Sequence, residues 1–215
     1  MTDVTDLGEI RVVGQRRRSD GTFPSRGSGA GGGGNNDTGA LEQEEVDPGD
    51  FTPDDEQDPC SDPATALEWN AEAAAAEARR QFLQKAAELG DDRLHHREFG
   101  AQLYQRSNGS VYVRAVTWGP RLAGTVTLDE SNPFGDTPIG EVHSHAGGNR
   151  VPSAADWERV DIFSAQTGQN YRSYIVARDI RDRTSDFAIR AYDTRSDRNV
   201  DIDGPEVNPD AQPCP

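Results

Sequence analysis

The sequence predicts an α/β (α+β) domain, in which a mixed β-sheet is flanked by helices and a long disordered tail comes first. Three observations predict this fold. A long alanine-rich segment with helical spacing covers residues 62–90. Short segments with alternating apolar residues follow it, separated by turns that contain glycine. A second capped helix, at residues 153–168, interrupts the strands before the last two.

The tail is predicted from composition. The 215-residue chain has only 33% hydrophobic residues and a mean hydropathy of -0.82, low values for a chain that packs throughout its length. Residues 27–40 have the composition of a flexible linker, and residues 37–62 contain eleven acidic side chains and no basic one. We therefore expect a disordered acidic and glycine-rich tail (1–60), a folded domain (61–195) and a flexible C-terminal tail (196–215).

The charge of the chain limits its partners and location. A net charge of -16 and a sequence pI of about 4.5 argue against nucleic acid or an anionic membrane as the main partner. No apolar run is long enough to span a membrane, and no secretory signal is visible, so a cytoplasmic or virion-associated location is expected. Residues 9–18 place Ile10, Val12 and Val13 before three arginines. They form either a short strand or docking segment for an assembly partner, or an unstructured part of the tail.

The first helix has a clear beginning and end. Asp62 can cap it, Pro63 suits its first position and Gly90 ends it. One face of this helix should pack on a core, and it carries Leu67, Ala71, Ala74, Ala78, Phe82 and Leu89.

The strands are predicted from alternation and turns. Residues 97–119 form a hairpin with Asn108 and Gly109 at its tight turn. Further strands are expected at residues 124–129, 138–145, 171–178 and 186–193. The second helix has Ser153 as its cap, Asp156 at the capping-box position and Gly168 at its end.

Three residues near the second helix are candidate metal ligands. His143 and His145 are two apart on a strand, so their side chains face the same side. A seven-residue loop that contains two glycines leads to the helix start, where Asp156 is the third candidate. Two histidines and one carboxylate leave a fourth zinc position for water, as in catalytic rather than structural zinc sites. The alternative is a solvated strand face followed by an ordinary capped helix.

Zinc-bound water needs a base to accept its proton, and a glutamate that does not bind the metal would serve. Glu141 shares the strand face of the two histidines, and Glu98 begins the first strand of the hairpin. Position alone does not decide between them.

These residues match a known motif. The pattern H-S-H-x7-S-x-x-D, formed by His143, His145, Ser153 and Asp156, resembles the signature of the JAMM (MPN-type) zinc metalloprotease family. The resemblance runs from residue 98 to about residue 192. The stretch EFGAQLY is similar to the opening of bacterial and phage JAB-like domains, including toxin modules, and the loop AGGNRVPS is similar to that of the RadC branch. One position departs from the pattern: many members have proline where this chain has Ala146.

The resemblance implies a fold, an activity and a role for each residue. It implies an MPN-like mixed sheet, with His143, His145 and Asp156 as zinc ligands. It selects Glu98 as the general base rather than Glu141, and Ser153 as a hydrogen-bond donor to the oxyanion. The reaction implied is hydrolysis of a peptide or isopeptide bond in a protein or peptide substrate. The alternatives are a non-catalytic JAMM-type component of a phage tail or secretion assembly, and a toxin effector module.

His95 and His96 are expected to be exposed linker residues rather than part of the metal site.

Trp118 and Trp157 are expected to pack at the core or its rim rather than to line a substrate groove. Cys60 and Cys214 favour two free thiols, because no export signal is visible; the alternative is one disulfide that joins the ends of the domain.

Overall fold

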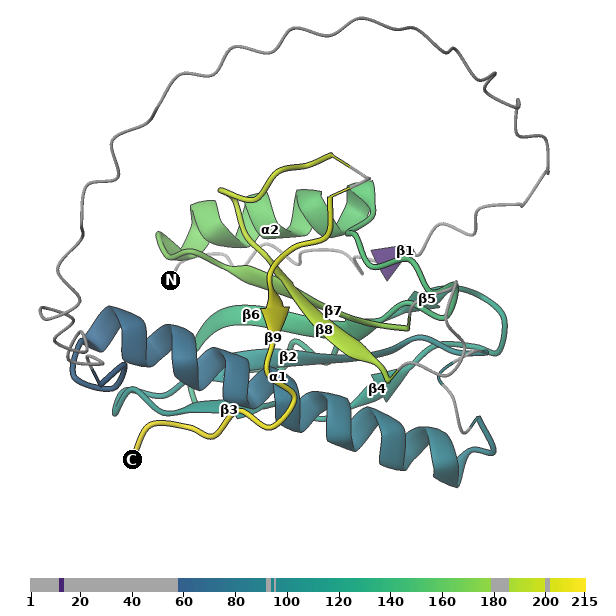
Figure 1. The fold of residues 1–215 in the computed structure, drawn as a ribbon, viewed down its shortest axis with the longest axis horizontal. Helices are drawn as coiled ribbons and strands as arrows, with labels where there is room; N and C mark the ends of the chain where they lie inside the picture. Colours follow the sequence, from purple (N-terminus) through teal and green to yellow (C-terminus); the bar gives the residue numbers. More distant parts are fainter. Residues whose placement is uncertain (1–11, 14–57, 92–93, 95, 179–185, 200–201) are drawn as a thin grey trace, which may run out of the picture. The chain divides into compact units, whose positions relative to one another are not determined.

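The computed structural model describes residues 12–13, 58–91, 94, 96–178, 186–199 and 202–215 (Figure 1). The chain divides into two units, residues 1–17 with 59–215 and residues 18–58, and the fold below belongs to the first. Most of the predicted disordered tail, residues 1–60, lies outside the described residues. The elements are β1 (Val12–Val13), α1 (Pro63–Glu88), β2 (Phe99–Gln105), β3 (Val111–Val113), β4 (Thr117–Trp118), β5 (Thr125–Val126), β6 (Thr137–Ser144), α2 (Ala154–Thr167), β7 (Arg172–Ala177), β8 (Ala188–Tyr192) and β9 (Glu206–Val207).

The main sheet is mixed, as the sequence predicts. Its strand order is β3-β2-β6-β7-β8-β9, and β4 also pairs with β2. Only β6 and β7 are parallel among its paired strands, and α2 is the crossover between them. β1 pairs with β5 in a separate two-stranded sheet, so part of the segment at residues 9–18 is a strand. No helix in the described part of the chain is long and apolar enough to cross a membrane.

The two helices cover opposite faces of the main sheet (Figure 1). Side chains alternate along each strand, so neighbours in β6 point to opposite sides. Val142 faces α1 and belongs to the main apolar core. His143 faces the other way, toward α2. The candidate metal ligands therefore lie on the α2 face.

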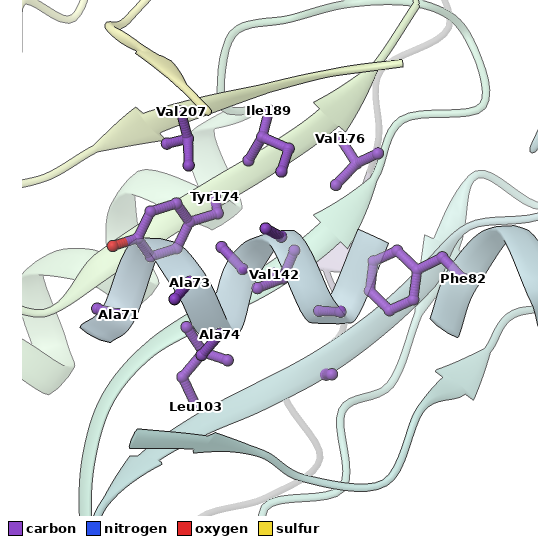
Figure 2. Close-up of a cluster of buried hydrophobic side chains, with 14 of the residues drawn as sticks. Ala71, Ala73, Ala74, Phe82, Leu103, Val142, Tyr174, Val176, Ile189 and Val207 are labelled. Carbon is purple, nitrogen blue, oxygen red and sulfur yellow. The ribbon is translucent and has the colours of Figure 1, made fainter. Parts of the chain in front are cut away.

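The α1 face is apolar and closely packed. Asp62 caps the helix by accepting from the Thr65 backbone N–H at 2.8 Å, as predicted. Most residues that α1 buries are alanines, which let the helix approach the sheet closely. Phe82 is the one large exception among them, and its ring lies 6.1 Å from that of Phe99. Figure 2 shows this core, with α1 alanines against Leu103, Val142, Tyr174, Val176, Ile189 and Val207.

The predicted turns and caps are present. Gly109 has φ +86° in the turn between β2 and β3, a conformation that glycine adopts without strain. Ser153 and Asp156 form a capping box at the start of α2, and Gly168 ends the helix with φ +65°.

The C-terminal segment differs from the flexible tail expected at residues 196–215. β9 pairs with β8, and Val207 and Ala211 are buried. The tail then follows α1: Trp69 donates from its indole N–H to the Gln212 carbonyl at 2.7 Å. Little in the sequence predicts this docking, because the segment is polar and rich in proline and its partners on α1 are far away in the chain.

The two cysteines form a disulfide between Cys60 and Cys214, so the favoured prediction of free thiols is wrong. The Cys214 backbone N–H also donates to the Asn70 side chain at 2.7 Å. The start of α1 and the end of the chain are thus joined covalently and by hydrogen bonds.

Loss of the disulfide should lower stability. It links positions 154 residues apart, so replacing Cys60 and Cys214 by serine should cost about 2–5 kcal/mol of unfolding free energy. Urea unfolding of the oxidised and reduced protein measures this. The double-serine variant is the control, because a reductant should not change its midpoint. An equal midpoint for oxidised and reduced wild-type protein would show that the link does not stabilise the fold.

Candidate metal centre

Strand register places the first histidine at the centre of the α2 face. His143 lies between Gly100 of β2 and Ile175 of β7 in the paired strands. Gly100 leaves room on this face, because a Cβ there would collide with Leu128 and Val126. His145 follows the end of β6 and its backbone N–H donates to the Val176 carbonyl at 3.1 Å. Sheet pairing therefore holds both histidines on one buried surface.

The capping box of α2 supplies the third group. The Asp156 backbone N–H donates to Ser153 Oγ at 3.3 Å, and Asp156 Oδ2 accepts from the Ser153 backbone N–H at 2.6 Å. The carboxylate is thereby fixed, and Oδ1 faces His143 Nε2 at 3.3 Å. Oδ1 accepts no hydrogen bond from the described residues although it is buried. One oxygen caps the helix, and the other is available to a cation.

The three groups converge. The Nε2 atoms of His143 and His145 are 3.0 Å apart, and His145 Nε2 lies 3.6 Å from Asp156 Oδ2. One potential ligand atom from each residue lies within 4.8 Å of the others, and all three residues are buried. Zinc–nitrogen bonds of about 2.0–2.1 Å would place two tetrahedral ligand atoms about 3.3 Å apart. The spacing fits one ion bound by all three residues.

The tautomers of the histidines explain why the centre favours a cation. His145 Nδ1 lies 2.8 Å from the Asn149 carbonyl oxygen, which can only accept, so Nδ1 carries the hydrogen. In neutral His145, Nε2 then presents a lone pair. That lone pair faces His143 Nε2 and the Asp156 carboxylate in a buried space. A proton or a metal ion has to lie among these groups to offset their mutual repulsion.

The pKa values of His143 and Asp156 also indicate that the centre favours a cation. Burial lowers the pKa of His143, but the nearby carboxylates of Asp156, Glu141 and Glu98 outweigh it and raise that pKa to about 9. Burial would raise the pKa of Asp156, but His143 and His145 keep it well below its usual value. The metal-free centre therefore retains a proton at neutral pH, which a metal ion would replace on binding.

Glu98 lies on the same side of the sheet as the histidines. It directly precedes β2, two residues before Gly100, the cross-strand partner of His143, so continuing the alternation of β2 by one residue places Glu98 on the α2 face. The side chain is buried and close enough to raise the pKa of His143. Its backbone carbonyl accepts from the Gly119 N–H at 2.8 Å, which fixes the start of β2.

Glu141 is also buried on this face, in a different environment. Its Oε2 accepts from Arg159 Nε, and its Oε1 lies 3.3 Å from Ser173 Oγ and 3.7 Å from His143 Nδ1. Glu141 thus lies behind the ring of His143, on the side away from Nε2. Its charge is already paired with a buried arginine.

Arg159 is a residue of this site that the sequence argument missed. It is fully buried and also donates to Gln102 Oε1 at 3.0 Å. A signal was present, because Arg159 is three residues after Asp156 on one helix and such residues lie on the same side. Burial of an arginine could not be inferred from that spacing alone.

The remaining predicted residues lie elsewhere. His96 Nδ1 is 3.0 Å from Asp91 Oδ1, so this histidine has a local partner, and His95 is outside the described residues.

Trp157 packs edge-on against Tyr192 with ring centroids 5.8 Å apart, at the rim of a small apolar cluster. Trp118 is exposed, with Lys85 Nζ 4.8 Å above its ring. Trp157 is thus packed at the rim as expected, whereas Trp118 belongs to none of the described apolar clusters.

The sequence matches no family model and no curated protein. The geometry above and the spacing of His143, His145 and Asp156 are thus what support a metal site here.

The stability of the metal-free protein should depend on the charge of His143. Its pKa is raised from 6.5 to about 9, so the protonated form stabilises the fold fully below pH 6.5, and this contribution is lost as pH rises through 9. Urea unfolding at pH 6, 8 and 10 in the presence of a chelator measures the loss. His143→Gln is the matched control for other groups that titrate in this range. If wild type and variant lose stability in parallel, the raised pKa is refuted.

Proposed function

We propose that this chain is a zinc-dependent hydrolase of JAMM type that cleaves a peptide or isopeptide bond. The observation that carries the proposal is the convergence of two imidazole Nε2 atoms and one carboxylate in a buried centre. Three protein ligands of this kind are typical of catalytic zinc, in which water completes the coordination. The motif positions and the buried Glu98 on the same face support the assignment.

The residues divide the chemistry among them. Zinc, when bound, would lower the pKa of a water molecule toward 7 and make it a nucleophile. The Glu98 carboxylate would accept the proton of that water and deliver it to the leaving amine. Ser153 Oγ accepts from the Asp156 backbone, so its own hydrogen remains available to donate to the oxyanion. His143, His145 and Asp156 would hold the ion.

Substitution separates binding from hydrolysis. His143→Ala and Asp156→Ala should lose most bound zinc, because each removes one of three ligands. Glu98→Gln should keep about one zinc per chain and lower the hydrolysis rate by about 10²–10⁴-fold, the usual contribution of a general base. Metal analysis and cleavage of a peptide library measure these effects.

Glu72→Gln is the control, because Glu72 is a half-buried glutamate on α1 whose nearby charges are Arg172 and Glu68. It should change neither zinc content nor rate. No zinc in any of these proteins would refute the metal site. A biological effect that survives Glu98→Gln but is lost when residues 18–58 are deleted, a deletion that keeps β1 and Cys60, would favour the assembly component instead.

The disulfide bears on where the protein works. Disulfides are rare in proteins of a reducing cytosol and common outside it. Cys60–Cys214 therefore favours a virion-associated or exported hydrolase, as a toxin effector would be, over a cytoplasmic one.

This assignment predicts that both cysteines are oxidised in the native setting. Alkylation of the freshly isolated protein without reductant should leave its mass unchanged, and reduction first should add two alkyl groups. Addition of two alkyl groups without prior reduction would show that both thiols are free in the native setting, which would favour a reducing compartment.

A further inference from the structure

A buried ionic cluster lies next to the metal centre, and the proposed chemistry makes no use of it. Its central pair is Glu141 and Arg159, both fully buried. Arg159 also reaches Gln102 Oε1 at 3.0 Å and Glu130 Oε1 at 2.5 Å. Tyr171 completes the group, with its hydroxyl 3.4 Å from Glu141 Oε2. Burying such charges costs free energy that apolar side chains of similar size would not, so the cluster is poorly explained by stability alone.

The position of the cluster relates it to the metal ligands. Gln102, Glu141 and Ser173 are partners across β2, β6 and β7, and form one row of the α2 face. His143 lies in the next row, two residues further along β6. Arg159 extends from α2 to the Glu141 row, and Asp156 lies one helical turn earlier. The cluster and the metal centre thus share one strand and one helix.

Glu141 faces the nitrogen of His143 that points away from the other ligands. The distance from Glu141 Oε1 to His143 Nδ1 is 3.7 Å, and Nδ1 has no hydrogen-bond partner among the described residues. A carboxylate can only accept, so its charge favours the tautomer with the hydrogen on Nδ1. That tautomer leaves the Nε2 lone pair directed at His145 and Asp156. Arg159 holds the other oxygen and so fixes the carboxylate.

We propose that Glu141, held by Arg159, is a positioning residue that keeps the His143 ring oriented with Nε2 free to bind the metal. The Glu141 charge acts on His143 Nδ1 across 3.7 Å, whereas the Asn149 carbonyl sets the tautomer of His145 through a 2.8 Å hydrogen bond. Carboxylates that accept from a metal-bound histidine are a common feature of zinc sites. The inference rests on the proposed metal site, but it does not require that the protein hydrolyses a peptide.

Metal affinity of matched variants tests the proposal. Glu141→Gln replaces an obligate acceptor by an amide that can also donate, and Arg159 retains Glu130 as a partner. Its zinc dissociation constant, measured by competition with a chromophoric chelator, should rise about 10–100-fold. Tyr171→Phe removes a contact from the same cluster but leaves the carboxylate, and should raise the constant by less than the roughly 10-fold lower limit expected for Glu141→Gln.

A spectroscopic measurement distinguishes positioning from simple support of the fold. In the zinc-loaded protein, His143 should carry its proton on Nδ1, and the charge of the Glu141 carboxylate 3.7 Å away should shift the resonance of that proton downfield. The resonance should move upfield in Glu141→Gln and stay in place in Tyr171→Phe, whatever the melting temperatures of the two variants.

The proposal is overturned if Glu141→Gln binds zinc as tightly as wild type, or if both variants lose affinity in proportion to their loss of stability. Should Glu141→Gln fail to fold, the double variant Glu141→Gln/Arg159→Gln leaves neither charge buried alone. The zinc dissociation constant of this double variant should rise about 10–100-fold, as expected for Glu141→Gln alone. A double variant that binds zinc as tightly as wild type would overturn the proposal. A protein with the expected affinities but no hydrolysis would instead refute the proposed activity and leave the positioning role intact.

Discussion

The candidate centre depends on the double use of Asp156. One of its oxygens accepts from the Ser153 backbone and begins α2, while the other faces His143. Because α2 is the crossover between the parallel strands β6 and β7, its first turn has to lie near the end of β6, where the histidines are. The same hydrogen bonds that start the helix therefore aim a carboxylate at two imidazoles. Without the Ser153–Asp156 cap, no other hydrogen bond among the described residues would direct the Asp156 carboxylate toward the two histidines.

The two faces of the sheet divide stability and chemistry between them. The α1 face is filled by alanines and apolar strand residues, and the C-terminal segment is tied to α1 through the Cys60–Cys214 disulfide. The α2 face buries histidines, carboxylates and Arg159 instead, and its apolar clusters are small. Buried charges are costly unless paired, so we infer that the apolar face and the disulfide offset the cost of the polar one.

Local signals predicted most of this architecture. Alternation, glycine turns and capping residues such as Asp62 and Ser153 predict both helices and the positions of the main strands along the chain, because these signals act within a few residues. The spacing from His143 to Asp156 predicted which residues meet in the centre. The partners of Arg159 and the docking of the C-terminal segment could not be predicted, since both depend on contacts between residues far apart in the sequence. The prediction of free thiols is wrong because it depends on the expected compartment, and the sequence does not show that Cys60 and Cys214 meet in the fold.

The central claim is that His143, His145 and Asp156 bind one metal ion together. X-ray absorption at the zinc edge of the zinc-loaded protein tests it most directly. We expect one zinc per chain with two imidazole nitrogens and only oxygen ligands besides, at about 2.0–2.2 Å, and the loss of one imidazole in His143→Ala. A zinc ion with sulfur ligands, or with the same number of imidazoles in wild type and variant, would contradict the account.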